Sequence, residues 1–340
     1  MARIVTFGEL MLRLSPEGYL RFLQADRFGV TFGGAEANVA AGLAILGMDA
    51  AFVTKLPKHE IGQAALNSLR RYGVDTSLIA RGGARVGIYF AEKGASQRPS
   101  KVIYDRADSA IAAASFADFN WDNILGGADW FHWTGITPAL GEGVTAILEQ
   151  ALKVCKQKKI SVSCDLNYRK NLWSKDKARE VMTKLAPYID VCIANEEDAD
   201  DVFGVKAADT DITGGKLSRS GYEFVAEQLA AKFGFGKVAI TLRGSVSAND
   251  NSWAGLLYDG TRCVFSKEYN IHIVDRVGGG DSFGAGLIYA FLNQFDCQKA
   301  IEFAAAASCL KQTIEGDYDL VSVDEINKLM QGDGSGRVVR

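Results

Sequence analysis

Few residues in this sequence are of the kind that build metal or disulfide sites. It has three histidines and six cysteines in 340 residues, and no two of the cysteines form a Cys-x-x-Cys pair. This spacing argues against a zinc site and against a disulfide framework. We therefore expect reduced, buried cysteines at all six positions, namely Cys155, Cys164, Cys192, Cys263, Cys297 and Cys309.

Long apolar runs and an excess of positive charge are also missing. No uncharged apolar run reaches the ~18–20 residues that span a bilayer, and the segment after Met1 is too short for a signal peptide. We therefore expect a cytoplasmic protein with no membrane partner. Lys and Arg (38) nearly balance Asp and Glu (41), which gives a net charge of −3. A nucleic-acid partner would need an extended basic stripe, and the sequence has none.

Proline is scarce and glycine abundant, with 5 prolines against 36 glycines. The glycine excess therefore indicates tight backbone turns rather than a flexible tail. The hydrophobic (48%) and charged (23%) fractions are those of a globular protein, which excludes disorder. No Gly-x-x-x-x-Gly-Lys-Ser/Thr loop occurs, so a phosphate-handling enzyme here is not a P-loop kinase.

Short apolar runs alternate with longer helical patterns through most of the chain. This alternation predicts an α/β fold with a doubly wound, mostly parallel sheet and helices on both faces. The predicted strands are 4–7, 50–53, 130–133, 160–163, 191–193 and 238–241. The predicted helices are 35–47, 60–73, 142–158, 174–187, 221–234, 281–294, 297–313 and 322–331.

Two stretches, about 12–33 and 84–107, break the alternation. In the second, residues 86–91 and 102–104 resemble paired strands around a polar loop. No linker divides the chain, so we expect a single domain over 1–340 that carries a small β lid formed by these two stretches.

The richest motif is Asp275-Arg276-Val277-Gly278-Gly279-Gly280-Asp281, which leads into an apolar helix. Glycines before a helix let backbone N–H groups converge on one point, where the helix dipole adds positive potential. Asp281 would repel a phosphate there unless it accepts the proton of a hydroxyl group. The simpler alternative makes Asp281 a helix N-cap. A dinucleotide-binding loop fits less well, because the third glycine is not at the required spacing.

A second glycine pair begins the segment Gly33-Gly34-Ala35-Glu36-Ala37-Asn38. Paired glycines permit close approach of the backbone to a ligand, and Asn38 offers a donor and an acceptor to sugar hydroxyls. A helix start with an inward-facing asparagine explains the same pattern.

Together, the two segments resemble the signature motifs of the ribokinase-like (phosphofructokinase-B) sugar kinase family. The first reads as Gly-Gly-x-x-x-Asn at 33–38 and the second as Asp-x-x-Gly-x-Gly-Asp at 275–281. Their order and separation agree with that family over nearly the whole chain. The resemblance implies a ribokinase-like fold and an enzyme that phosphorylates a sugar.

The resemblance also assigns roles to the motif residues. It implies that Asp281 is the catalytic base, and a helix N-terminus predicts that this carboxylate stays ionised at neutral pH. It implies an anion hole formed by the N–H groups of Gly278, Gly279 and Gly280, and sugar contacts from Gly33, Gly34 and Asn38.

ATP and Mg²⁺ are the cofactors that the resemblance implies. Asn195-Glu196-Glu197-Asp198 is similar to the family's Asn-x-x-Glu motif, although its fourth residue is an aspartate. Glu196, Glu197 or Asp198 would then hold magnesium through water, or the segment is only an acidic first helical turn. The nucleotide contacts implied are Asn167, Arg169, Asn195, Thr241, Arg243, Gly244, Gly278 and Gly280, and Arg243 has a surface position as its alternative.

Two arginines bear on the choice of sugar. Arg106 and Arg169 follow predicted strands, and arginine pairs well with a planar carboxylate, which plain sugars lack. These segments look like the 2-keto-3-deoxygluconate kinase branch of the family. That likeness implies substrate contacts from Gly34, Tyr89, Tyr104, Arg106, Arg169, Asp281 and Asp317. The alternatives are half-buried strand aromatics for the two tyrosines and a surface ion pair for Arg106.

We therefore expect ATP-dependent phosphorylation of the terminal hydroxyl of a six-carbon sugar acid. The alternatives are a fructokinase or ribokinase relative that acts on a neutral sugar, and a non-catalytic sugar or nucleotide sensor on the same fold. An oxidoreductase would need a nicotinamide pocket, for which the sequence gives no signal. Apolar strands in the lid favour a homodimer or a higher homo-oligomer. The gluconate or galactonate epimer and any monovalent-cation requirement are not readable from the sequence.

Overall fold

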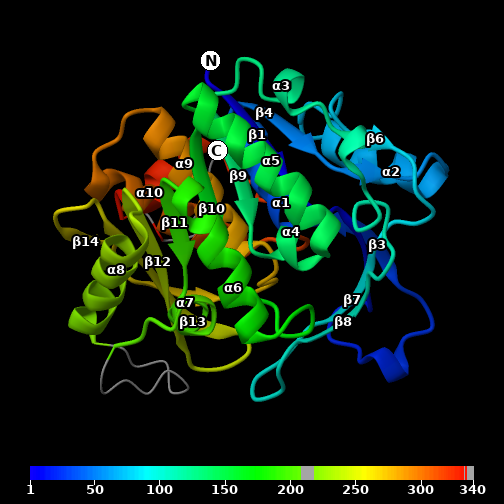
Figure 1. Cartoon of the computed structure of the whole chain (residues 1–340). Coiled ribbons are helices and arrows are strands. Elements are labelled where there is room, and N and C mark those ends of the chain that lie inside the picture. The colour runs from blue at the N-terminus through cyan, green and yellow to red at the C-terminus, as the bar shows by residue number, and fades with distance from the viewer. Residues whose placement is uncertain (208–217, 333, 335–340) are drawn as a thin grey trace.

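A nine-stranded sheet forms the centre of the protein (Figure 1). The structure is a computed structural model that describes residues 1–207, 218–332 and 334. The strand order is β14-β13-β12-β11-β10-β9-β1-β4, and β15 also pairs with β13. These strands are β1 (Arg3–Phe7), β4 (Asp49–Val53), β9 (Trp130–Thr134), β10 (Ser161–Asp165), β11 (Val191–Ala194), β12 (Lys237–Ser245), β13 (Asp250–Tyr258), β14 (Cys263–Phe265) and β15 (Tyr269–His272).

The six predicted strands become β1, β4, β9, β10, β11 and β12, and they pair in parallel. Their apolar runs are buried on both faces, as strands between two helical layers must be. Strands β13, β14 and β15 were not predicted, and they extend the sheet in antiparallel fashion. The predicted mostly parallel α/β class is therefore confirmed.

Helices cover both faces of this sheet, as Figure 1 shows. One face packs against α5, α6 and α8, and the other against α1, α9 and α10. The helices are α1 (Ala35–Ile45), α2 (Glu60–Arg70), α3 (Trp121–Ile124), α4 (Ile136–Ala139), α5 (Glu142–Lys158), α6 (Lys175–Leu185), α7 (Glu196–Phe203), α8 (Arg219–Phe233), α9 (Gly279–Leu292), α10 (Cys297–Lys311) and α11 (Val323–Met330). All eight predicted helices are present, with ends shifted by a few residues.

The two stretches that interrupt the alternation form a separate four-stranded sheet in the order β3-β2-β7-β8. Its strands are β2 (Met11–Ser15), β3 (Gly29–Gly33), β7 (Ile88–Glu92) and β8 (Lys101–Asp105). The predicted pairing is confirmed, because β7 and β8 are antiparallel with Tyr89 opposite Tyr104. Its role as a lid stays a prediction, as does the assignment of 1–340 to one domain. A small pair of β5 (Lys55–Leu56) and β6 (Ala80–Arg81) was not predicted.

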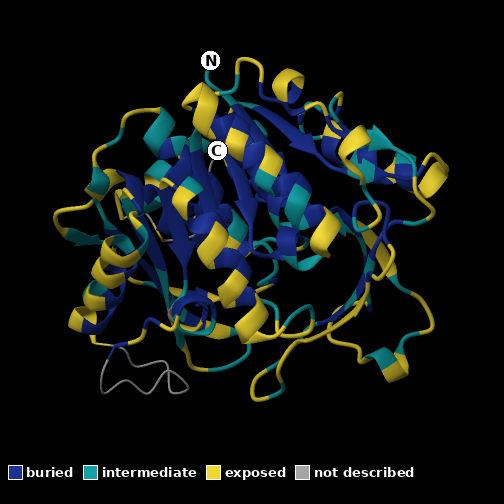
Figure 2. Ribbon diagram, viewed as in Figure 1, coloured by how far each residue is buried: buried dark blue, intermediate teal, exposed yellow. Residues whose placement is uncertain are grey.

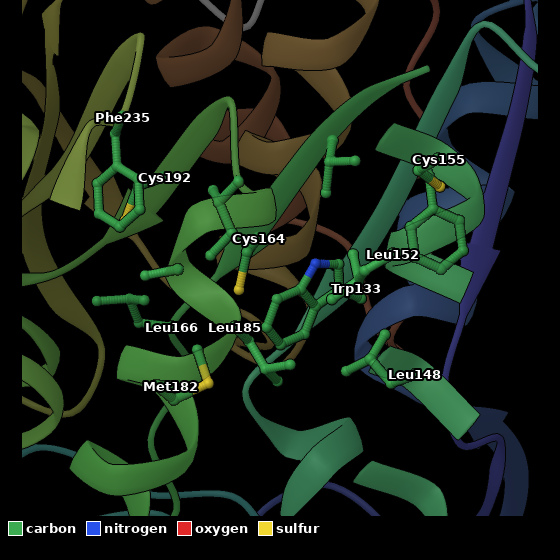
Figure 3. Packing of buried hydrophobic residues seen from close by; sticks show 14 of the residues in the cluster. Trp133, Leu148, Leu152, Cys155, Cys164, Leu166, Met182, Leu185, Cys192 and Phe235 are labelled. Carbon is green, nitrogen blue, oxygen red and sulfur yellow. The ribbon is translucent and has the colours of Figure 1, made fainter. Parts of the chain in front are cut away.

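The core lies between the sheet and its helices (Figure 2). Figure 3 shows one part of it, where Trp133, Cys164 and Leu185 belong to a buried hydrophobic cluster. All six cysteines are free thiols, as predicted, but Cys263 and Cys297 are only half-buried. Within the described residues, no helix combines the length and apolar character that a bilayer crossing requires.

Candidate active site

A cleft of about 1380 Å³ opens at the carboxyl ends of the parallel strands, between them and the four-stranded sheet. Ligand sites of open α/β sheets lie at this edge. The cleft brings together most of the predicted site residues: Gly34, Asn38, Tyr89, Tyr104, Arg106, Asn167, Arg169, Asn195, Glu197, Asp198, Thr241, Arg243, Gly278, Gly279, Gly280, Asp281 and Asp317. Gly33 and Gly244 are not among its lining residues. The side chain of Glu196 lies outside the described part of the structure.

The second motif, residues 275–281, which is called the glycine motif below, leads into the N-terminus of α9. Gly278 is the N-cap, with a left-handed φ of 85°, and Asp281 stands in the first helical turn. The alternative that makes Asp281 the N-cap is therefore wrong. Among the described residues, the N–H groups of Gly278, Gly280 and Asp281 have no hydrogen-bond acceptor. The N–H of Gly279, which was also predicted for the anion hole, already donates to the carbonyl of Arg276 at 3.3 Å. Free N–H groups at a helix N-terminus attract an anion.

Asp281 meets the first glycine motif directly. Asn38 Nδ2 donates a hydrogen bond of 2.7 Å to Asp281 Oδ2. Asn38 is itself held, because its Oδ1 accepts from the N–H of Gly34 at 3.2 Å. Burial raises the pKa of Asp281 to about 6, against the bond from Asn38, which lowers it. Burial thus outweighs the helix N-terminus, on which the prediction of an ionised carboxylate rested. With a pKa of about 6, the carboxylate of Asp281 is still mostly ionised at pH 7, as predicted.

A buried network of charges holds the four-stranded sheet to the glycine motif. Arg13 of β2 donates to Asp317 Oδ1 at 2.7 Å and to Asp275 Oδ2 at 2.6 Å. Tyr89 of β7 donates its hydroxyl to the other oxygen of Asp317. Burial raises the pKa of Tyr89 well above its usual range, so it stays a donor. The hydroxyl of Tyr89 and the carboxylate of Asp317, which were both predicted to bind substrate, are thus hydrogen-bonded to each other.

The sequence analysis missed Arg13, although the sequence holds a weak signal for it. Arg13 lies on the same side of its strand as Met11, and both are buried. A charged residue on the buried side of a strand needs a charged partner, because an unpaired buried charge is costly.

The two arginines that were predicted to bind a carboxylate differ in burial and in ion pairing. Arg106 is buried and pairs through Nε and Nη2 with Glu9 Oε2, so its alternative as a surface ion pair is wrong. Its Nη1 makes no hydrogen bond to any described residue. Arg169 is half-buried, donates to the carbonyl of Tyr168 at 2.9 Å, and forms no ion pair with a described carboxylate. Both line the cleft and have donors left for a ligand.

Two more carboxyl groups face the cleft beside Arg169. Burial raises the pKa of Asp198 to about 7 and that of Asp165 well above its usual range, and the two carboxyls repel each other. Asp198 accepts from the N–H of Tyr168 at 3.0 Å and from Asn195 Nδ2 at 2.9 Å. Asn195 is the N-cap of α7, so the acidic residues that follow it do form the first turn of a helix. The alternative is therefore right about where these residues lie.

Glu36 anchors the helix that carries Asn38, a role that was not predicted. Its Oε1 accepts from Thr134 N at 3.0 Å and from the hydroxyls of Thr134 and Thr137 at 2.7 and 2.6 Å. These bonds join α1 to the end of β9. A Cβ at Gly8 would lie 2.0 Å from Glu36 Oε2, so a larger residue there would displace this carboxyl group.

A doubly wound sheet whose cleft holds a carboxylate beside free helix N–H groups fits an enzyme for phosphoryl transfer to a hydroxyl group. The chain belongs to the pfkB family of carbohydrate kinases, whose family model matches residues 1–322. This match confirms the resemblance to the family. It also contradicts the alternative that the chain is an oxidoreductase.

Individual relatives agree with this family. The crystal structure of 2-dehydro-3-deoxygluconokinase from Thermotoga maritima is 55% identical, with a TM-score of 0.94 over 97% of this chain and 98% of that one. The 2-dehydro-3-deoxygalactonokinase of Haloferax volcanii is 34% identical over 98% of both chains. The 2-dehydro-3-deoxygluconokinase of Bacillus subtilis is 27% identical over 93% of this chain and 91% of its own. The prefixes 2-dehydro and 2-keto name the same group.

Proposed function

We propose that this carbohydrate kinase transfers the γ-phosphoryl group of ATP to the terminal, C6 hydroxyl of 2-keto-3-deoxygluconate. The observation that carries the proposal is the position of Asp281, hydrogen-bonded to Asn38 and adjacent to the free N–H groups of Gly278 and Gly280. A base and an anion site thus lie within one helical turn.

Asp281 accepts the proton of the C6 hydroxyl while the hydroxyl oxygen forms a bond to the γ-phosphorus. The bond between the γ-phosphorus and the bridging oxygen breaks, and ADP leaves with that electron pair. The transition state is loose, so the protein acts mainly by positioning the groups and neutralising charge. The free N–H groups at the start of α9 face the charge that the phosphoryl oxygens carry. Asn38 holds the carboxylate of Asp281 in place.

A sugar acid matches the free guanidinium donors that line the cleft better than a neutral sugar does. Arg169 has no carboxylate partner among the described residues. Arg106 pairs with Glu9 through Nε and Nη2, but its Nη1 makes no hydrogen bond to a described residue. A planar carboxylate matches these guanidinium donors. The named functions of the Thermotoga maritima and Bacillus subtilis relatives support the gluconate epimer, and that of the Haloferax volcanii relative supports the galactonate epimer. The higher identity of the first favours gluconate.

The acidic side chains fit a magnesium ion that keeps most of its water. No group of three or more acidic, histidine or cysteine side chains in the described residues forms a direct metal cage. Asp198 already accepts two hydrogen bonds, and Glu197 is exposed at the cleft. Magnesium is commonly bound by one or two carboxylates together with substrate phosphates, and Asp198 and Glu197 would hold it through water. When bound, it supplies positive charge to the phosphate oxygens.

A panel of sugars tests the substrate class. We expect ADP release with Mg²⁺, ATP and 2-keto-3-deoxygluconate at a kcat/KM at least ~100-fold above that for fructose or ribose. The galactonate epimer belongs in the same panel. A preference for fructose or ribose would contradict the sugar-acid proposal and favour the neutral-sugar alternative.

A matched pair of variants locates the carboxylate contact. Arg106→Ala alone would leave Glu9 buried without its partner, which is strongly destabilising. The double variant Glu9→Gln with Arg106→Met removes both charges, and Glu9→Gln alone is its control. Compared with the Glu9→Gln control, the double variant should have a KM for the sugar acid that is at least ~10-fold higher. Its KM for fructose should equal that of the control.

We also infer a cytoplasmic homodimer that pairs through the four-stranded sheet. Every residue of its edge strand β8 is exposed, including Val102, Ile103 and Tyr104. Exposed apolar side chains on an edge strand favour pairing with another chain. Sedimentation of the wild-type protein should give twice the 36.7 kDa mass, and Ile103→Lys should give the monomer. A monomeric wild-type protein would contradict this inference.

A further inference from the structure

Lys311, in the last turn of α10, is a buried cation directly behind the glycine motif. Its side chain is fully buried. Its Nζ donates to the backbone carbonyls of Gly316 at 2.6 Å, Asp275 at 3.2 Å and Ile314 at 3.5 Å. No described carboxylate forms a direct ion pair with it. The ammonium group is therefore surrounded mainly by carbonyl oxygens.

These carbonyls come from two separate segments. Ile314 and Gly316 follow α10, whereas Asp275 begins the loop that leads to Gly278. An ordinary lysine at a helix C-terminus would neutralise the last carbonyls of its own helix. Lys311 instead joins a carbonyl beyond its helix to one about 40 residues earlier in the chain, so its bonds fix how the two segments lie against each other.

The glycine motif rests on these two segments. A Cβ at Gly278 would lie 2.0 Å from the carbonyl oxygen of Asp317 and 3.2 Å from Cε of Lys311. Gly316 N also donates to Asp275 Oδ2 at 3.2 Å, and Asp275 N donates to the carbonyl of Gln312 at 3.2 Å. A shift of either segment would therefore move Gly278 and its free N–H group.

A cluster of neutral carbonyl oxygens is also the kind of site that takes a potassium or ammonium ion from solution, because these ions are weakly hydrated and prefer such ligands. We propose that Lys311 is a positioning residue whose ammonium group serves as a built-in monovalent cation, holding residues 275–280 in their phosphate-binding shape without a cation from solution. The effect on turnover rests on the proposed function, whereas the effect on the loop does not.

The wild-type enzyme provides the first measurement. ATP is supplied as its tetramethylammonium salt, and the chlorides of sodium, potassium, ammonium and tetramethylammonium are compared at equal ionic strength with Mg²⁺ constant. We expect kcat values within about twofold of each other. A gain of tenfold or more with potassium or ammonium would overturn the proposal.

The second measurement empties the carbonyl cluster. Lys311→Ala should lower kcat at least tenfold, and ammonium or methylammonium should restore most of it, whereas the bulky tetramethylammonium should not. Lys299→Ala, at an exposed lysine of the same helix, is the matched control and should show neither effect. Lys311→Met fills the space without charge and should lose kcat with no rescue by any cation. Wild-type kcat in Lys311→Met would overturn the proposal.

Thermal unfolding without substrate separates this proposal from the proposed function. The Tm of Lys311→Ala should rise with ammonium relative to tetramethylammonium, and the Tm of the wild-type protein should not differ between them. If no sugar acid is phosphorylated but this difference in Tm appears, the proposed substrate is wrong and the role of Lys311 in the loop stands. If the Tm of Lys311→Ala is the same in both salts, the built-in cation is wrong, whatever the substrate.

Discussion

Asp281→Asn should lower kcat by about 10³-fold, because a positioned general base contributes ~10²–10⁴-fold to such a reaction. Asparagine has nearly the same shape, and its side-chain oxygen can still accept from Asn38 Nδ2. We therefore expect the KM values for ATP and sugar to change little. Initial rates of ADP release over both substrate concentrations measure this. Turnover near that of the wild-type enzyme would refute the assignment of Asp281 as the base.

The pH profile of the wild-type enzyme belongs to the same prediction. Only the deprotonated carboxylate accepts a proton, so kcat/KM should rise as the pH increases through about 6, the pKa to which burial raises Asp281 in the free enzyme, and should fall below that pH. The same raised pKa means that Asp281 contributes stability at a pH below its unfolded pKa and loses it as the pH rises through about 6. At pH 8, the Tm of Asp281→Asn should thus be unchanged or higher.

Asp319 provides the matched control. Burial raises its pKa to about 6 as well, and it accepts a hydrogen bond from Ser282 in the first turns of α9. Asp319 is not among the residues that line the cleft. Asp319→Asn should therefore leave kcat within about threefold of the wild-type value. A loss as large as that of Asp281→Asn would mean that any buried carboxyl at this helix end is needed, which would contradict a specific base.

The parallel part of the sheet was predictable because its strands are buried on both faces. A strand such as β9, Trp130–Thr134, is a short apolar run that a helix follows, and this pattern is legible without tertiary information. The antiparallel strand β13 was not predicted. It begins with Asp250, Asn251 and Ser252, which read as a loop, although Asn251 is buried against β12. Pairing with β12 in the folded chain, rather than local composition, makes this segment a strand.

Within the site, motif residues were predictable and their supporting charges were not. Asp281 and Asn38 stand in recognisable motifs, and they meet across 243 residues of sequence. Arg13 and Lys311 stand in no motif. A sequence gives each charged residue a default position at the surface, and only the folded chain shows the carboxylates or carbonyls that make burial tolerable. Arg106 is a further example, because its burial depends on an ion pair with Glu9, which lies 97 residues away in the sequence.

Gly278→Ala should lower kcat by at least about 10²-fold, the scale of losing one donor to a developing oxyanion. Gly278 has a left-handed φ of 85°, which an L-residue adopts at a cost of roughly 1–2 kcal/mol. The new Cβ would also lie 2.0 Å from the backbone oxygen of Asp317, so the loop must move. The free N–H groups beside Asp281 then no longer point at the phosphoryl group. Steady-state rates with the sugar acid measure the loss.

Gly47→Ala separates this steric effect from backbone strain. Gly47 has a similar left-handed φ of 87°, but no heavy atom lies within 4 Å of a Cβ built there, and it is not among the cleft residues. Its substitution should therefore lower the Tm by the strain alone and leave kcat unchanged. Gly278→Ala should lower the Tm further, because the contact with Asp317 adds to the same strain. Equal Tm losses with normal turnover in both variants would show that the loop at Gly278 absorbs a side chain freely, and the backbone of residues 278–281 would then not be the phosphate-binding element.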